Sequence, residues 1–145
     1  MIIEVAGESA MKEFGQAIGE RLVGGEVVQL VGDVGAGKTT FTKGLATGLG
    51  VTEDVQSPSF TISRVYDGRD NIQLAHYDFY RLTDAGIMTN ELAEATSDPL
   101  TVTVIEWAGI VEGVLPPSSV TVSITAPSDE VRLVEVPDIW KEWIV

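Results

Sequence analysis

The sequence predicts an α/β fold in a single domain, with a mixed parallel and antiparallel central sheet flanked by helices. Apolar runs of strand length alternate with segments whose apolar residues recur at helical spacing. Two pairs of strand candidates are joined by short turn-rich connectors, which favour antiparallel neighbours in part of the sheet. The third observation is the glycine-rich segment G-D-V-G-A-G-K-T, residues 32–39, between a strand candidate and a helix candidate. No linker, repeat or low-complexity stretch interrupts the 145 residues, so we expect one domain.

The chain before the glycine-rich segment is expected to form a strand, a helix and a second strand. Residues 2–5 are a short apolar strand candidate, and residues 27–31 predict a buried strand. Between them, Ser9 is expected to cap a helix that the pair Gly24-Gly25 ends. The residues that share the apolar face of this helix are Met11, Phe14, Ile18 and Leu22.

The chain after the glycine-rich segment begins with a helix candidate, residues 39–49, with Gly50 at its C-terminal cap. Its apolar face consists of Phe41, Leu45 and Leu49. The later elements follow from apolar runs bounded by turn residues and prolines. We expect strands at 61–66 and 72–77 around a connector at 67–71, helical segments within 84–96, a strand at 100–105, a helix at 107–115, and a hairpin of strands 120–125 and 131–136. For the tail at 137–145, with Trp140 and Trp143, the sequence leaves open whether it packs on the domain.

The glycine-rich segment has the pattern G-x-x-x-x-G-K-[ST] of a phosphate-binding loop. Such a loop wraps a polyphosphate with its backbone N–H groups, which requires glycine where a side chain would block the approach. Lys38 is then able to reach the β- and γ-phosphates, and the Thr39 hydroxyl is able to hold a magnesium ion. The sequence therefore predicts a nucleoside triphosphate site on a P-loop NTPase fold.

Charge and composition exclude other classes of protein. Nine Lys and Arg against 22 Asp and Glu give a net charge of −13, and the cations are scattered, so autonomous nucleic-acid binding is not expected. The acidic surface is either simple solvation or a face for a basic protein partner. The absence of cysteine excludes disulfides and thiolate metal sites. No apolar run approaches the roughly 18 residues of a membrane span and the N-terminus has no basic signal-peptide region, so we expect a cytoplasmic protein without a membrane role.

Two acids end strand candidates and are candidates for chemistry on the nucleotide. Glu106 follows the strand 100–105 and, at the carboxyl end of a strand beside the phosphate-loop strand, is placed to orient magnesium or polarise water. The alternative is a solvated strand cap. Asp78, in the run H-Y-D-F-Y-R at 76–81, is a further ligand or water-positioning candidate, and Arg81 a candidate for charge near the γ-phosphate. The alternative is an aromatic core with a surface Asp78–Arg81 ion pair and an interior histidine.

Four segments, in this order and spacing, resemble the bacterial TsaE (YjeE) family, small P-loop ATPases of tRNA threonylcarbamoyladenosine synthesis. They are G-D-V-G-A-G-K-T-T-F at 32–41, S-P-S-F-T at 57–61, H-Y-D-F-Y-R-L at 76–82 and V-I-E-W-A at 104–108. The resemblance spans residues 4–125 and implies weak hydrolysis of ATP with Mg²⁺. It implies an accessory role for the complex that modifies adenosine 37 of tRNA, with TsaD- and TsaB-type proteins as partners and tRNA contacted only through them.

The resemblance also implies roles for individual residues. Thr39 and Glu106 would hold magnesium, Asp78 would assist hydrolysis together with Lys38 and Glu106, and Trp107 would lie beside the site. The stretch around Glu8 would border the adenine. From its residues alone, the polar segment 57–61 is a candidate switch that responds to the γ-phosphate, and the alternative is an ordinary loop. The residues implied to bind the nucleotide are Glu8, Gly35, Ala36, Gly37, Lys38, Thr39 and Thr40.

Two other functions stay open on the residues alone. A small-molecule kinase would share the phosphate loop, but such enzymes bring several lid arginines to the transferred group, and only Arg64, Arg69 and Arg81 lie between Lys43 and Arg132. A guanine-nucleotide switch would resemble its family in carrying N-K-x-D, and neither Asn71 nor Asn90 precedes a lysine.

Overall fold

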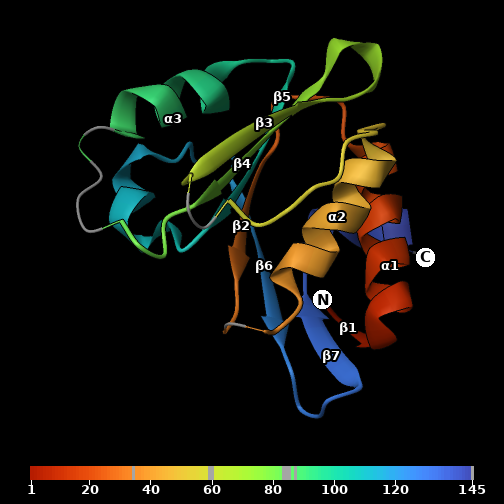
Figure 1. Ribbon diagram of the computed structural model, residues 1–145. Coiled ribbons are helices and arrows are strands. Elements are labelled where there is room, and N and C mark those ends of the chain that lie inside the picture. The colour runs from red at the N-terminus through yellow and green to blue at the C-terminus, as the bar shows by residue number, and fades with distance from the viewer. Residues whose placement is uncertain (34, 59–60, 83–85, 87, 145) are drawn as a thin grey trace.

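The computed structural model describes residues 1–33, 35–58, 61–82, 86 and 88–144. One seven-stranded sheet has the order β1-β7-β6-β2-β5-β4-β3 (Figure 1). Its strands are β1 (Ile2–Ala6), β2 (Val27–Val31), β3 (Ser63–Asp67), β4 (Gln73–Asp78), β5 (Thr101–Glu106), β6 (Val120–Thr125) and β7 (Val131–Glu135). The helices are α1 (Gly7–Arg21), α2 (Lys38–Gly48), α3 (Met88–Ser97) and α4 (Lys141–Ile144), with 3-10 turns η1 (Arg69–Asn71), η2 (Ala108–Val114) and η3 (Asp138–Trp140).

The sheet is mixed, as the sequence predicts. Its centre is parallel, because β2 lies between β5 and β6, and β4 continues the parallel part beyond β5. Both edges are antiparallel, where β3 pairs with β4 on one side and the β6–β7 hairpin is followed by β1 on the other. The predicted single-domain α/β fold with helices flanking a mixed sheet is therefore confirmed.

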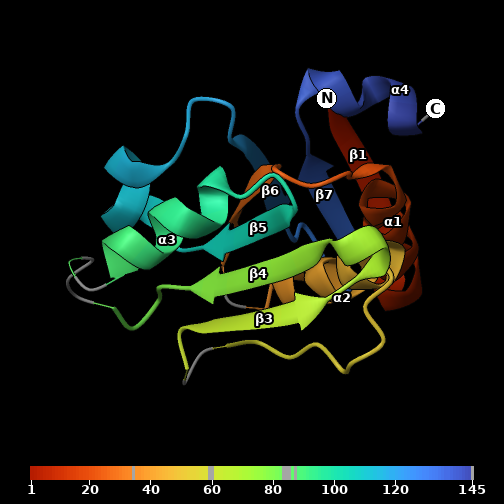
Figure 2. The same cartoon turned by 90° about the horizontal axis from the view of Figure 1, so that it is seen from above.

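Helices cover both faces of the sheet, and each face has its own apolar core. Figure 2 shows α1 and α2 on one side of the sheet and α3 on the other. The core on the α1 side includes Phe41, Leu45 and Val104, whereas the core on the α3 side includes Tyr77 and Leu92. This arrangement buries both faces of the central strands. The carboxyl ends of the parallel strands lie together at one end of the sheet, where the loop between β2 and α2 also lies (Figure 1).

Helices α1 and α2 pack unusually closely through glycines. Gly15 and Gly19 of α1 face Gly44 and Gly48 of α2, and a Cβ atom at any of the four would collide with backbone of the other helix. At Gly19 the atom it would strike is the carbonyl oxygen of Leu45. Backbone cannot yield as a side-chain tip does, so a methyl group there must separate the helices.

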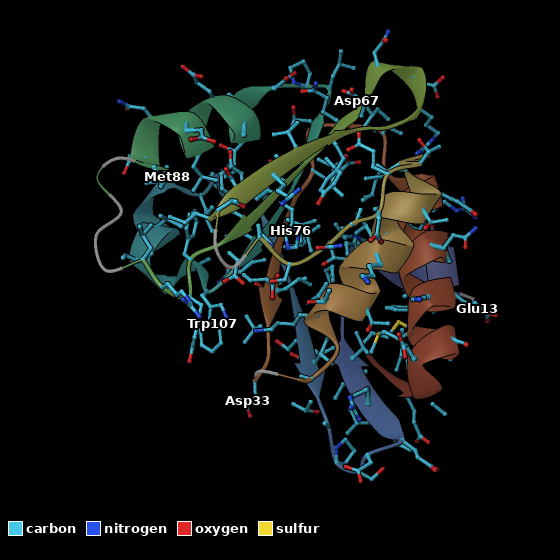
Figure 3. All side chains as sticks on the ribbon, in the orientation of Figure 1. Glu13, Asp33, Asp67, His76, Met88 and Trp107 are labelled. Carbon is cyan, nitrogen blue, oxygen red and sulfur yellow. The ribbon has the colours of Figure 1, made fainter. Side chains whose placement is uncertain are left out.

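Replacing Gly19 by alanine is expected to lower the free energy of unfolding by about 1–3 kcal/mol, the range for overpacking in a core. Alanine has a higher helix propensity than glycine, which alone would stabilise α1. The clash outweighs this gain because the atom that the new methyl group meets belongs to the backbone of α2. Urea unfolding followed by circular dichroism measures it. Glu13→Ala, at an exposed position of the same helix (Figure 3), is the control and is expected to change stability by less than about 0.5 kcal/mol. Equal stability of the two variants would contradict the close packing.

Arg69 ties the C-terminal ends of α1 and α2 together. Its Nη1 donates to the carbonyl of Gly48 (3.0 Å) and its Nη2 to those of Leu22 (2.7 Å) and Glu20 (3.2 Å). The last carbonyls of a helix have no partner within the helix, so one guanidinium here satisfies acceptors at two helix ends. No local feature of the sequence around Arg69 predicts this structural role.

Several expected boundaries are wrong, each for a local reason. Ser9 does not cap α1, because the chain turns into the helix at Gly7, whose N–H donates to the Glu130 carbonyl (2.8 Å), and no side chain caps the helix. Strand β3 begins at Ser63 rather than at residue 61, because Ile62 has a φ of 71° in a turn closed on Pro58.

The other differences are smaller, and part of one lies outside the described residues. The helix expected from residue 107 is a 3-10 turn from Ala108, because Trp107 has a left-handed φ of 58°. Strands β4 and β5 each lie one residue later than expected, and β7 ends one residue earlier than expected. The start of the helix expected over 84–96 falls partly on residues 84, 85 and 87, outside the described residues, and α3 itself begins at Met88.

Residues 137–144, the described part of the C-terminal tail, pack on the domain. Trp140 is buried in the α1-side core and its ring stacks on Trp143 at 5.7 Å between centroids. The N-terminal amine of Met1 forms an ion pair with Asp138 (3.3 Å), which brings the two ends of the chain together. Across the described ranges, no helix combines the length and the apolar character needed to cross a bilayer.

Candidate functional site

The glycine-rich loop joins the carboxyl end of β2 to the first turn of α2. Gly35 and Gly37 have left-handed φ values of 83° and 112°, which glycine adopts readily and other residues rarely. A Cβ at Gly35 would meet nothing within 4 Å, so this part of the backbone faces open space. Lys38 is the first residue of α2, and the helix N-terminus has no side-chain cap. The loop therefore presents backbone and a helix N-terminus to an anion, with space for it. Residue 34 is outside the described part.

A cavity of about 360 Å³ lies over this loop. It brings together most of the site residues that the sequence predicts, from four separate stretches of the chain. The lining residues are Gly35, Gly37, Lys38, Thr39, Thr40, Ser57, Asp78, Tyr80, Arg81, Glu106 and Trp107. Ala36 is buried instead and lines a neighbouring hollow beside β6.

The two predicted acids lie side by side. Asp78 ends β4 and Glu106 ends β5, and they are register partners in the parallel pair that these strands form. The side chains are 6% and 3% exposed, so neither is a solvated strand cap. Parallel neighbours place their carboxyl ends at the same edge, which is why both acids reach the cavity. The expectation that Glu106 lies on a strand beside the phosphate-loop strand is confirmed, because β5 pairs with β2.

Lys38 connects the loop to Glu106. Its Nζ donates to the Gly32 carbonyl (2.7 Å), lies 3.8 Å from Glu106 Oε1, and sits 4.3 Å from the ring centroid of Trp107. The side chain is 7% exposed. Its charge is thus directed into the cavity by a carbonyl, a carboxylate and an aromatic face.

His76 of β4 forms a hydrogen bond with Glu106 at the end of the neighbouring strand β5. Figure 3 shows His76 in the interior between the sheet and α2. Its Nε2 lies 2.8 Å from Glu106 Oε2, and since a carboxylate only accepts, Nε2 carries the proton and donates. The other ring nitrogen, Nδ1, has no hydrogen-bond partner within the described part of the chain. The sequence left open whether His76 is an interior polar residue, and this is confirmed because His76 is buried. Its hydrogen-bond partner is Glu106, one of the two acids of the cavity.

An aromatic pair forms one wall of the cavity. The rings of Tyr80 and Trp107 are 4.8 Å apart between centroids, and both are partly exposed, at 58% and 38%. The left-handed backbone at Trp107 is unfavourable for a bulky residue, and such strain gathers at functional sites. An aromatic core is the correct reading for Tyr77 and Phe79, which are buried, and the wrong one for Tyr80.

Ser57 and Arg81 reach the same cavity from the segments that flank β3 and β4. Ser57 Oγ donates to Asp78 Oδ2 at 3.5 Å, and Asp78 Oδ1 accepts from the Tyr80 N–H at 3.0 Å. Asp78 is buried, so it is not the surface residue that the alternative expects. Of the candidate switch at 57–61, residues 59 and 60 lie outside the described residues.

Glu8 lies in an adjoining cavity of about 330 Å³. This second cavity is also lined by Asp129, Glu130 and Arg132 of the β6–β7 hairpin. The two cavities share three residues, Gly35 and Gly37 of the loop and Thr40 of α2. An elongated ligand whose anionic end sits over the loop has room to continue into the second cavity.

The residues of the first cavity fit a magnesium-bound polyphosphate. The open space at Gly35 and the helix N-terminus suit phosphate oxygens, and the buried amine of Lys38 supplies charge. Thr39 and Glu106 offer the oxygen donors that magnesium prefers. Asp78 supplies a second carboxylate within reach of the same space.

Comparison with known proteins gives one family. Residues 5–134 match the family described as "Threonylcarbamoyl adenosine biosynthesis protein TsaE". The tRNA threonylcarbamoyladenosine biosynthesis protein TsaE of Treponema pallidum is 41% identical, covering 85% of this chain and 90% of its own. The protein of the same name from Streptomyces coelicolor is 37% identical, covering 92% and 93%. The crystal structure of YdiB from Bacillus subtilis superposes with a TM-score of 0.76 at 30% identity, over 99% of this chain and 90% of that one.

Proposed function

The chain belongs to the TsaE family, proteins of tRNA threonylcarbamoyladenosine biosynthesis, and from this premise we propose that it is a weak, magnesium-dependent ATPase that serves the threonylcarbamoyl transferase as an accessory protein. The observation that carries the proposal is the meeting of Lys38, Asp78 and Glu106 in one cavity over the phosphate loop. Cycles of ATP binding and hydrolysis would return the transferase to a state ready for the next tRNA.

Each residue of the cavity has a distinct task in this proposal. The amides of Gly35, Gly37, Thr39 and Thr40 bind phosphate oxygens, whereas the Ala36 N–H donates to the Asp33 carbonyl (3.0 Å) and is not assigned to the phosphates. Lys38 neutralises the β- and γ-phosphates. Asp78, fixed by the Tyr80 N–H and the Ser57 hydroxyl, accepts a hydrogen bond from the attacking water. Glu8 borders the base in the adjoining cavity.

Thr39 and Glu106 would hold magnesium. When bound, the ion neutralises charge that develops on the phosphate oxygens during transfer. Glu106 is kept in place by His76 and Lys38, so its free oxygen lone pairs have a fixed direction. A carboxylate held in this way does not need to reorganise when the metal arrives.

The charge distribution supports work through protein partners. The net charge is −13, and the described contacts commit Lys38, Arg69 and Arg132 to backbone carbonyls. Neutralising several tRNA phosphates requires a basic face, so tRNA would be contacted only through TsaD- and TsaB-type proteins. Work on tRNA together with these partners would take place in the cytoplasm. Hydrolysis by the chain alone is expected to be slow and to rise when these partners bind.

The proposal predicts that Lys38→Ala stops the transferase after its first round of tRNA modification. The assay combines cognate partner proteins, tRNA and an activated threonylcarbamoyl donor, and counts modified tRNA per complex over many turnovers. Wild-type protein is expected to sustain repeated rounds, because each requires ATP hydrolysis. Lys43→Ala removes the same charge from the same helix, outside the cavity, and is expected to behave as wild type.

Two outcomes would contradict the proposal. Equal yields with wild type and Lys38→Ala would show that the ATP cycle does not drive turnover. Equal yields with and without this protein would remove it from the modification reaction as assayed.

A further inference from the structure

Arg132 bridges the β6–β7 hairpin and the phosphate loop. Its Nε donates to the carbonyl of Ala36 at 2.9 Å, across 96 positions of sequence. Its Nη1 donates to three carbonyls of the hairpin, those of Ser128 (2.7 Å), Asp129 (3.2 Å) and Val131 (3.2 Å). The planar guanidinium has its donors in a fixed fork, so anchoring one side to the hairpin directs Nε at the loop.

The Ala36 carbonyl determines where the next N–H points. The described peptide bonds are trans, and in a trans peptide the carbonyl and the following N–H point in opposite directions. The carbonyl of Ala36 is turned toward Arg132, which lines the second cavity and not the first. The N–H of Gly37 is therefore turned away from Arg132. Gly37 lines both cavities, and of the two only the first is not lined by Arg132.

Local backbone preference does not fix this orientation. The peptide between Ala36 and Gly37 rotates through the ψ angle of Ala36 and the φ angle of Gly37 together, and the Gly37 φ is 112° here. Glycine adopts positive and negative φ with similar ease, so the flipped peptide is accessible to the free loop. A hydrogen bond from a charged donor is stronger than one between neutral groups, and the bond from Arg132 selects one of the two orientations.

We propose that Arg132 is a positioning residue that holds the Ala36–Gly37 peptide with its N–H facing the phosphate cavity before the nucleotide arrives. The inference rests on the proposed nucleotide site and adds to it a residue outside the phosphate-loop motif. A loop already in its binding conformation does not have to be ordered by the ligand, so preorganisation raises affinity. The Arg132 side chain reaches the loop from the β6–β7 hairpin and acts through the backbone of the loop.

The direct test measures the Gly37 N–H orientation in nucleotide-free protein by residual dipolar coupling. The variants are Arg132→Ala and Arg132→Lys; lysine keeps the charge but lacks the fork that spans hairpin and loop. Both are expected to change the Gly37 coupling from its wild-type value. The matched control is Arg69→Lys, which alters an arginine with similar carbonyl contacts at the helix ends and is expected to leave the Gly37 coupling unchanged.

The second readout is ATP affinity by calorimetry at fixed salt concentration. Arg132→Lys is expected to raise the dissociation constant about tenfold, the effect of losing one charge-assisted hydrogen bond, whereas Arg69→Lys leaves it unchanged. Full rescue by lysine of what alanine loses would assign the effect to charge alone and overturn the proposal.

Three further results separate this inference from the nucleotide site itself. An unchanged Gly37 coupling in Arg132→Lys and Arg132→Ala overturns the positioning role. Equal loss of affinity in Arg132→Lys and Arg69→Lys assigns the loss to general destabilisation and also overturns it. If wild-type protein binds no ATP, the proposed function fails, while the coupling in the nucleotide-free protein still decides whether Arg132 orients the peptide.

Discussion

Lys38→Ala is expected to abolish the stabilisation of this protein by magnesium-ATP. A ligand that binds only the folded state raises the free energy of unfolding by about 2.7 kcal/mol at a hundredfold excess over its dissociation constant. The Lys38 side chain is 7% exposed and its amine lies beside the Gly32 carbonyl and Glu106 in the cavity, so its loss would remove a cation from the proposed phosphate site. Thermal unfolding with and without magnesium-ATP measures the effect.

The control for this experiment is Lys43→Ala. Lys43 belongs to α2 as Lys38 does, but it does not line the phosphate cavity, so the shift with ATP is expected to persist. Circular dichroism must show that Lys38→Ala is folded, because the buried Glu106 loses an ionic partner in this variant. A folded Lys38→Ala protein with the full ATP shift would remove Lys38 from nucleotide binding.

The elements with strong local signals could be predicted from the sequence. Strands β2 and β6 have the bounds that the apolar runs predict, and Gly50 follows α2 with the left-handed φ expected after a helix end. The phosphate-loop pattern at residues 32–39 could be recognised locally. A loop that binds a polyphosphate through its backbone N–H groups needs particular residue types within eight consecutive positions. Ser9 failed as a cap because the pairing of β1 with β7, a long-range interaction, set where the helix starts.

The meeting of Asp78 and Glu106 could be predicted only in part. The sequence places each acid at the end of a strand, and the rule for carboxyl ends of parallel strands then places them near the phosphate loop. That β4 is the immediate neighbour of β5, with the two acids in register, depends on strand order. Strand order results from packing among distant segments, for which one sequence has no local signal.

The sequence could not predict the contacts that Arg69, Arg132 and His76 make, for a different reason. The two arginines bind backbone carbonyls, which every residue carries, so no residue type marks the acceptor. The partner of His76 is Glu106, 30 positions away on the neighbouring strand. A lone histidine in a strand has no signature that separates a core position from one beside a site acid.

Glu106→Gln and Asp78→Asn are each expected to lower ATP hydrolysis at least about a hundredfold, the scale of removing a general base or a metal-directed carboxylate. The amides keep the shape of each side chain, so the ATP dissociation constant is expected to change by less than about tenfold, because binding rests mainly on the loop and Lys38. Single-turnover hydrolysis and calorimetric binding, both with magnesium, measure the two quantities separately.

The control for these variants is Asp67→Asn. Asp67 also ends a strand, but β3 runs antiparallel to β4. This exposed acid therefore lies beside the start of β4, at the end of the strands far from the cavity (Figure 3). Its hydrolysis rate is expected to match wild type. Unchanged single-turnover hydrolysis in Glu106→Gln or in Asp78→Asn would exclude that residue from the chemical step. A loss of hydrolysis that follows an equal loss of ATP affinity would instead assign the carboxylate to ground-state binding, since only interactions strengthened in the transition state lower the rate at saturating ATP.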